Sequence, residues 1–181
     1  MSQRIPPVAE NDWPDDIRPA LDRLAGERGR PLNVFRTLAN HPRLFLRWLG
    51  LGEQLLDHST LPPRLRELVI LRTATLAGSS YEWAHHTVIG RSAGLSEDEI
   101  ARVREGPDAA GWSDTDLAVL RAVDELYGGN DLSESTWAGL STRWHTQQLM
   151  EMVITVGFYT MTATFLNAFR VEIDPGSGRV E

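Results

Sequence analysis

The densest group of acid–base side chains in this 181-residue chain lies between Glu67 and His86. Glu82 and His86 are four residues apart, so they share one face of a helix. A carboxylate beside an imidazole orients the ring and raises its pKa. A histidine held in this way can donate or accept a proton during a reaction near neutral pH. The spacing therefore predicts a site for proton transfer.

A Gly-Ser-Ser break separates Glu67 from the helix that carries Glu82 and His86. This break folds the two helices back on each other, which brings Glu67 beside the pair. We predict a catalytic set in which His86 is the general acid or base, Glu82 orients it, and Glu67 is a second acid–base group or holds water. The alternative is a surface Glu82–His86 pair that only stabilises its helix.

Four neighbouring residues are predicted to bind substrate: Tyr81, His85, Ser79 and Arg66. Each of the first three has an alternative structural role. Tyr81 has the features of a core anchor, Ser79 those of a helix cap, and His85 those of a packing or surface residue, because adjacent side chains point about 100° apart on a helix.

Glu82, His85 and His86 are also metal-ligand types. Their order is Glu-x-x-His-His, whereas zinc proteases use His-Glu-x-x-His. A metal at these residues stays an open alternative, and we predict none. The chain also lacks a Gly-rich phosphate-binding loop, and we predict no cofactor.

Composition narrows the function further. The chain has no cysteine, which removes disulfides, thiolate nucleophiles and cysteine-bound metals. Its net charge of −7 opposes unspecific binding to nucleic acid or to an anionic membrane. Polar residues interrupt the longest apolar segment, 150–169, and the N-terminus lacks an apolar signal core. We predict a cytoplasmic protein with no membrane or nucleic-acid partner.

The elements that must position these residues are helices, because start and stop signals for helices recur and strand alternation is nearly absent. Asp12, Thr60, one of Ser79 or Ser80, and the segment from Ser113 to Asp116 are predicted to cap helices, and Ser133 is predicted to start one. The segment from Ser96 to Glu99 predicts a capping box. The predicted helices are about 13–29, 31–40, 42–57, 62–78, 79–94, 96–105, 113–130, 133–140 and 146–170.

We predict a single all-α domain, a helical bundle with an N-terminal helical extension. Residues 1–60 form an arm and extension, residues 61–172 form the core that carries the motif, and residues 173–181 form a flexible tail.

Three segments, 62–72, 81–86 and 90–96, together resemble the carboxymuconolactone decarboxylase superfamily, which includes the alkylhydroperoxidase-D-like proteins. The resemblance covers roughly residues 60 to 170. It implies an all-helical bundle that assembles as a homo-oligomer (a dimer, trimer or hexamer), with sites close to subunit contacts.

The peroxidase-like branch of this superfamily carries a Cys-x-x-Cys pair, a downstream histidine and an upstream glutamate. The matching positions here are Ser79, Glu82, His86 and Glu67. Serine and glutamate cannot perform thiol–disulfide chemistry, so the chain resembles a cysteine-free branch without thiol peroxidase activity.

The first functional hypothesis is therefore a cofactor-independent enzyme that decarboxylates a small organic acid or lactone, or performs a related proton transfer. Tyr81 would hydrogen-bond an enolate oxygen, and Arg64, Arg66 or Arg72 would pair with the substrate carboxylate. Two alternatives are a non-catalytic helical oligomer that binds a small molecule and a cysteine-free antioxidant protein.

Overall fold

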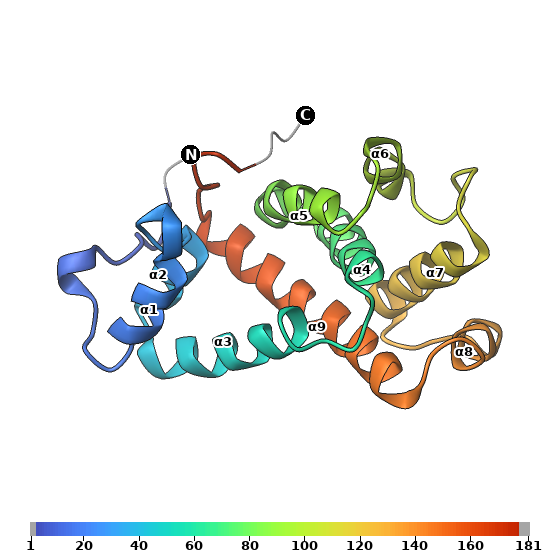
Figure 1. Cartoon of the computed structure of the whole chain (residues 1–181), viewed down its shortest axis with the longest axis horizontal. Helices are drawn as coiled ribbons and strands as arrows, with labels where there is room; N and C mark the ends of the chain where they lie inside the picture. Colours follow the sequence, from blue (N-terminus) through green and yellow to red (C-terminus); the bar gives the residue numbers. More distant parts are fainter. Residues whose placement is uncertain (1–2, 178–181) are drawn as a thin grey trace.

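A computed structural model describes residues 3–177, which contain nine α-helices, two short 3-10 turns and no strand (Figure 1). The predicted all-α class is confirmed. The helices are α1 (Arg18–Ala25), α2 (Asn33–Leu38), α3 (Pro42–Leu56), α4 (Pro63–Leu76), α5 (Ser80–Ser92), α6 (Glu97–Glu105), α7 (Asp114–Gly129), α8 (Glu134–Ser141) and α9 (Thr146–Phe169).

The central helix of the core is α4, which packs against α5, α6, α7 and α9. Its residues 68–71 are apolar in succession, and all four side chains are fully buried. A helix that is apolar on every face must be covered on every face. The site residues on α4 are therefore held in the best-packed part of the molecule.

Helices α1 to α3 lie beside one end of α9, at the left of Figure 1, and build a second apolar cluster. Ile17, Leu21 and Phe45 are fully buried there, and Leu166 from α9 packs into the same cluster. A smaller cluster, which includes Leu55 of α3 and Tyr159 of α9, links this layer to the core.

Serine hydroxyls cap several helices as predicted. Ser79, Ser113 and Ser133 each accept a hydrogen bond from a backbone N–H of the first turn, and Ser96 forms a capping box with Glu99. These contacts satisfy donors that have no partner inside the helix.

Two predicted caps are wrong. Asp12 ends a 3-10 turn, Glu10–Asp12, and α1 begins only at Arg18, because Trp13 is extended before Pro14 and residues 15–17 form a turn. Thr60 does not cap α4. Its hydroxyl and its N–H both donate to Glu151 at the start of α9, 2.9 and 2.7 Å away.

Among residues 3–177, α9 is the one helix that is long and apolar enough to cross a membrane. Of its most apolar 18-residue window, 44% is buried inside the protein, against helices such as α4 and α7. A core helix of a soluble protein has the same length and composition.

Candidate functional site

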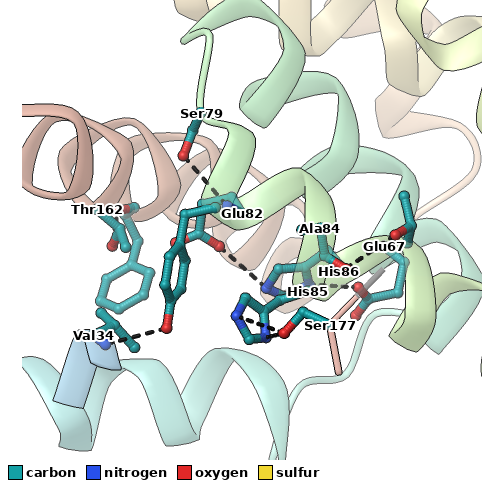
Figure 2. A network of polar contacts seen from close by, with 12 residues as sticks. Val34, Glu67, Ser79, Glu82, Ala84, His85, His86, Thr162 and Ser177 are labelled. Carbon is teal, nitrogen blue, oxygen red and sulfur yellow. Dashed lines mark hydrogen bonds and ion pairs between the residues drawn. The ribbon is translucent and has the colours of Figure 1, made fainter. Parts of the chain in front are cut away.

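The turn between α4 and α5 places Glu67 beside His86. Gly78 adopts a φ of +60°, a left-handed conformation that glycine tolerates without a steric penalty. Ser79 then caps α5, and the two helices pack along each other. As a result, Oε2 of Glu67 lies 2.7 Å from Nδ1 of His86 (Figure 2).

A second carboxylate approaches the other ring nitrogen. Oε2 of Glu82 lies 3.3 Å from Nε2 of His86, so the imidazole is held between two carboxylates. The side chain of Glu67 is completely buried, and Glu82 and His86 are each 5% exposed. Arg66 donates to Glu67 from 3.1 Å, which produces a row of alternating charges when His86 is protonated.

The charge state of His86 follows from these contacts. Burial lowers the pKa of the imidazole, but the attraction of Glu67 and the hydrogen bonds to Glu67 and Glu82 outweigh burial and raise it to about 9. His86 therefore carries a proton on each ring nitrogen at neutral pH, and the Nε2 proton is directed to the side of Glu82.

A cavity of about 770 Å³ adjoins this group. Its wall includes Glu82, His86 and Tyr159, and α1 to α3 and the segment 174–177 contribute to the remainder. Glu67 is not part of the wall. It lies behind His86, where it fixes the ring, so this geometry favours an orienting role over the predicted second acid–base role.

The other end of the cavity is built around Asp174. Its carboxylate accepts hydrogen bonds from the hydroxyl of Tyr81 at 2.6 Å and from the backbone N–H of Asn33 at 3.0 Å. Nε2 of His85 lies 3.3 Å from the same carboxylate, and the hydroxyl of Ser177 contacts the His85 ring (Figure 2). Asp174 thereby joins α2, α5 and the C-terminal segment.

Burial raises the pKa of the Asp174 carboxyl, but the hydrogen bonds from His85, Tyr81 and Asn33 outweigh burial and lower it. Asp174 is 6% exposed, so the flexibility predicted for residues 173–181 does not extend to this residue. Residues 178–181 lie outside the described part of the chain.

The predicted substrate-binding residues divide into two groups. Tyr81 and His85 line the cavity, as do Glu82 and His86, which are predicted to be catalytic. However, the Tyr81 hydroxyl donates to Asp174 and accepts from the N–H of Val34, so it is committed to the fold. The predicted bond from Tyr81 to an enolate oxygen is not available in this arrangement.

Ser79 and Arg66 do not line the cavity, so the structure gives no support to their prediction as substrate-binding residues. Ser79 faces the end of α5 as its cap, and Arg66 donates to Glu67 and to the carbonyl of Leu56. Arg64 and Arg72 are likewise held by carboxylates on α6 and α7. The three arginines proposed for a substrate carboxylate are structural.

Three features of the cavity were missed from the sequence. Asp174 stands in a Pro-Gly-Ser segment that indicates a turn, and Tyr159 lies inside a long apolar helix. Arg28 and Arg30 flank a glycine between helices, and both are exposed cavity residues that form no hydrogen bond or ion pair with residues 3–177. Neither arginine belongs to a helical pattern or a motif, so the sequence gives no reason to select them.

The predicted absence of a metal remains a prediction. In the described range 3–177, no three histidine, aspartate or glutamate side chains converge on one point as a ligand set. Glu82 and His86 face each other, whereas His85 faces Asp174, because adjacent residues on α5 point in different directions.

Comparisons with known proteins agree with this geometry. Residues 42–125 match the model of the carboxymuconolactone decarboxylase family, a segment that begins with α3 and includes Glu67, Glu82 and His86. A search of curated proteins found no match. The part of the chain from residue 42 to residue 125 is therefore similar to the carboxymuconolactone decarboxylase family, in line with the predicted resemblance.

Several solved structures share the fold. A peroxidase-related protein from Ralstonia eutropha JMP134, described as an alkylhydroperoxidase AhpD core, has a TM-score of 0.85 and 19% identity over 96% of this chain and 93% of its own. A peroxidase-related protein from Silicibacter sp. TM1040 has a TM-score of 0.82 and 14% identity over 99% of both chains.

A cysteine-to-alanine variant of the debrominase Bmp8, in complex with 2,3,4-tribromopyrrole, has a TM-score of 0.78 and 16% identity over 97% of this chain and 94% of its own. At these identities the likeness establishes the fold. Because the matched structures cover nearly the whole chain, α1 to α3 have counterparts in them.

Proposed function

We propose that this protein is a cofactor-independent enzyme that decarboxylates a small organic acid or lactone, or performs a related proton transfer. The observation that carries the proposal is the position of His86. A buried, protonated imidazole is held between Glu67 and Glu82 at the wall of a cavity. A proton donor fixed in this way is what a carbanion or enolate intermediate requires.

The size and lining of the cavity fit such a substrate. Its volume of about 770 Å³ lies within the usual range for small-molecule sites. Apolar side chains such as Phe35, Trp48 and Phe158 line it together with the few polar groups. Arg28 and Arg30 are available to pair with a substrate carboxylate.

The proposed reaction is balanced without a co-reactant. The bond between the carboxylate carbon and its neighbour breaks, CO2 leaves, and the electron pair is delocalised to form an enolate. His86 then gives its Nε2 proton to the carbon, and water restores the proton to the ring. Glu67 does not line the cavity, and its contact with Nδ1 of His86 holds that proton in place throughout.

The test is a screen of small carboxylic acids and lactones for CO2 release or product formation, followed by His86→Ala with the best substrate. Removing a general acid should lower kcat by about 10²–10⁴-fold. His58→Ala is the matched control, because His58 is exposed and does not line the cavity. A His86→Ala variant that keeps its helicity and full activity contradicts the proposal.

A second candidate, binding without turnover, is favoured by the debrominase variant that was solved with a bound tribromopyrrole. This chain has the same fold but no cysteine. Calorimetric titration with halogenated pyrroles and with the acids of the screen separates the two candidates. Tight binding with no chemical change in any ligand would favour a binding protein.

We also propose a homo-oligomer. Exposed apolar side chains recur at helical spacing along α9, at Met150, Val153, Ile154 and Met161. Light scattering coupled to size-exclusion chromatography measures the mass directly, and a mass of about 20 kDa would contradict the proposal.

A further inference from the structure

The hydroxyl of Tyr159 is a polar group of the cavity that the fold does not use. Tyr159 is 3% exposed and lines the cavity. Its hydroxyl makes no hydrogen bond with any of residues 3–177, yet it is not one of the polar atoms sealed from solvent. Because Tyr159 lines the cavity, the cavity is the route by which a ligand would reach this hydroxyl.

The ring of Tyr159 lies against the proton donor. Its centroid is 5.0 Å from that of His86, and the two rings are perpendicular at 89°. The ring of Phe158 makes a second edge contact with the Tyr159 ring, with centroids 5.5 Å apart. Both contacts involve the ring and not the hydroxyl, so the ring is fixed while the hydroxyl is left free.

Phenylalanine at this position would keep both ring contacts and would lose no hydrogen bond within residues 3–177. Packing therefore accounts for the ring of Tyr159 but not for its hydroxyl.

The hydroxyl can act only as a neutral donor. Burial raises the pKa of Tyr159 well above its usual value, and the negative charges of Glu82 and Glu67 raise it further. The group is therefore protonated at neutral pH. A fixed neutral donor at the wall of a cavity stabilises negative charge that develops on a nearby oxygen.

We propose that the Tyr159 hydroxyl donates a hydrogen bond to the substrate oxygen that becomes negative when CO2 leaves, beside the carbon that His86 protonates. This rests on the proposed function. It narrows the substrates to acids in which a carbonyl or lactone oxygen is conjugated with the carbon that loses the carboxylate. In such acids, the breaking bond delivers its electron pair to that oxygen, which is the atom the hydroxyl contacts.

Tyr81 cannot take this role, although it lines the same cavity. Its hydroxyl already donates to Asp174 and accepts from Val34. The hydroxyl of Tyr81 therefore stabilises the fold, whereas the hydroxyl of Tyr159 is available to a ligand.

The experiment compares wild type with Tyr159→Phe, which keeps the ring. The first measurement uses 4-nitrophenol as the ligand and needs no substrate. The absorbance of 4-nitrophenol reports whether the bound molecule is a phenol or a phenolate. We expect phenolate to bind wild type about 10–100-fold more tightly than the variant, the size of a hydrogen bond to a charged acceptor. Nitrobenzene, which lacks the phenolic oxygen, should bind wild type and the variant equally.

Tyr127→Phe is the matched control, because Tyr127 lies on α7 and does not line the cavity. Its phenolate affinity should equal that of wild type. The melting temperature of Tyr159→Phe should be unchanged or higher, which a structural role would not allow. Equal phenolate affinity in wild type and Tyr159→Phe, or no phenolate binding by wild type, overturns the proposal.

With a substrate from the screen, Tyr159→Phe should lower kcat by about 10²–10³-fold and leave KM nearly unchanged. If His86→Ala abolishes turnover and Tyr159→Phe does not, the role of Tyr159 is wrong and the proposed function stands. If no acid or lactone is turned over, the proposed function fails, and the phenolate measurement still decides whether Tyr159 binds an anionic oxygen.

Discussion

Two adjacent histidines on α5 each have a carboxylate partner, but the two carboxylates do different things. Within residues 3–177, the side chain of Glu67 has two hydrogen-bond partners, His86 at 2.7 Å and Arg66 at 3.1 Å, and the imidazole is the nearer of the two. Asp174 contacts His85 and also holds Tyr81 and the first N–H of α2, so its charge is spread over several donors.

The difference shows that contact between a histidine and a carboxylate does not by itself define the role of the pair. At the Glu67 end, a deeply buried carboxylate lies 2.7 Å from one imidazole, and together with Glu82 it raises the pKa of His86 to about 9. At the Asp174 end, the same chemical pair fastens the C-terminal segment to α2 and α5. The proton transfer that we propose belongs to the first end, whereas the second end assembles the cavity wall.

The largest expected effect that tests this contrast is the pH dependence of stability. The pKa of His86 is raised in the folded state, from 6.5 to about 9. Its contribution is thus fully present below pH 6.5 and is lost as the pH rises through 9. The loss should be about 3 kcal/mol, measured by urea unfolding between about pH 6 and pH 10. His86→Gln should flatten this dependence.

Asp174→Ala should come next, with a loss of about 2–3 kcal/mol in the free energy of unfolding. The change leaves the N–H of Asn33 and the hydroxyl of Tyr81 without an acceptor. Hydrogen exchange should increase in α2, while the pKa of His86 stays near 9. A stability equal to wild type would show that Asp174 does not fasten the segment.

Glu67→Gln should lower the pKa of His86 by about one unit or more, because the neutral amide removes the main attraction for the imidazolium. The pKa is read from the imidazole signals in an NMR titration, and the pH–rate profile should shift with it. Asp174→Asn is the matched control and should leave the value unchanged. Equal shifts in the two variants would abolish the distinction between the two ends.

The smallest effect is expected for Ser177→Ala. The hydroxyl contacts the ring of His85 at 3.2 Å, but this serine lies near the end of the described chain and leaves Asp174 in place. The free energy of unfolding should change by less than about 0.5 kcal/mol in thermal or urea unfolding. A loss as large as that of Asp174→Ala would show that the whole segment, and not the carboxylate, forms the contact.

Much of the fold could be predicted from residue patterns. The spacing of apolar residues gave nine helices, and the serine caps at positions 79, 96 and 113 were located correctly, because helix periodicity and capping depend on residues a few positions apart. The prediction that Asp12 caps a helix was wrong. A residue that can cap a helix does so only where a helix begins, and α1 begins only after Pro14.

The site was predictable only where it is local. Glu82 and His86 are one helical turn apart, so their contact follows from α5 itself. Glu67 required one further assumption, a reversal at Gly78, which its left-handed φ supports. Asp174 and Tyr159 could not be found, because each reaches the cavity through packing against helices far away in sequence.

The sequence by itself determined the helical class, the Glu67–Glu82–His86 group and the absence of thiol chemistry in this chain, since each depends on residue type and short spacing. Only the tertiary structure decided which groups face the cavity. Arg66 and Ser79 form hydrogen bonds outside the cavity, and the hydroxyl of Tyr81 donates to Asp174. The hydroxyl of Tyr159 forms no hydrogen bond within residues 3–177. The physical reason is that a side chain's role depends on its burial and on competition among partners, which packing alone sets.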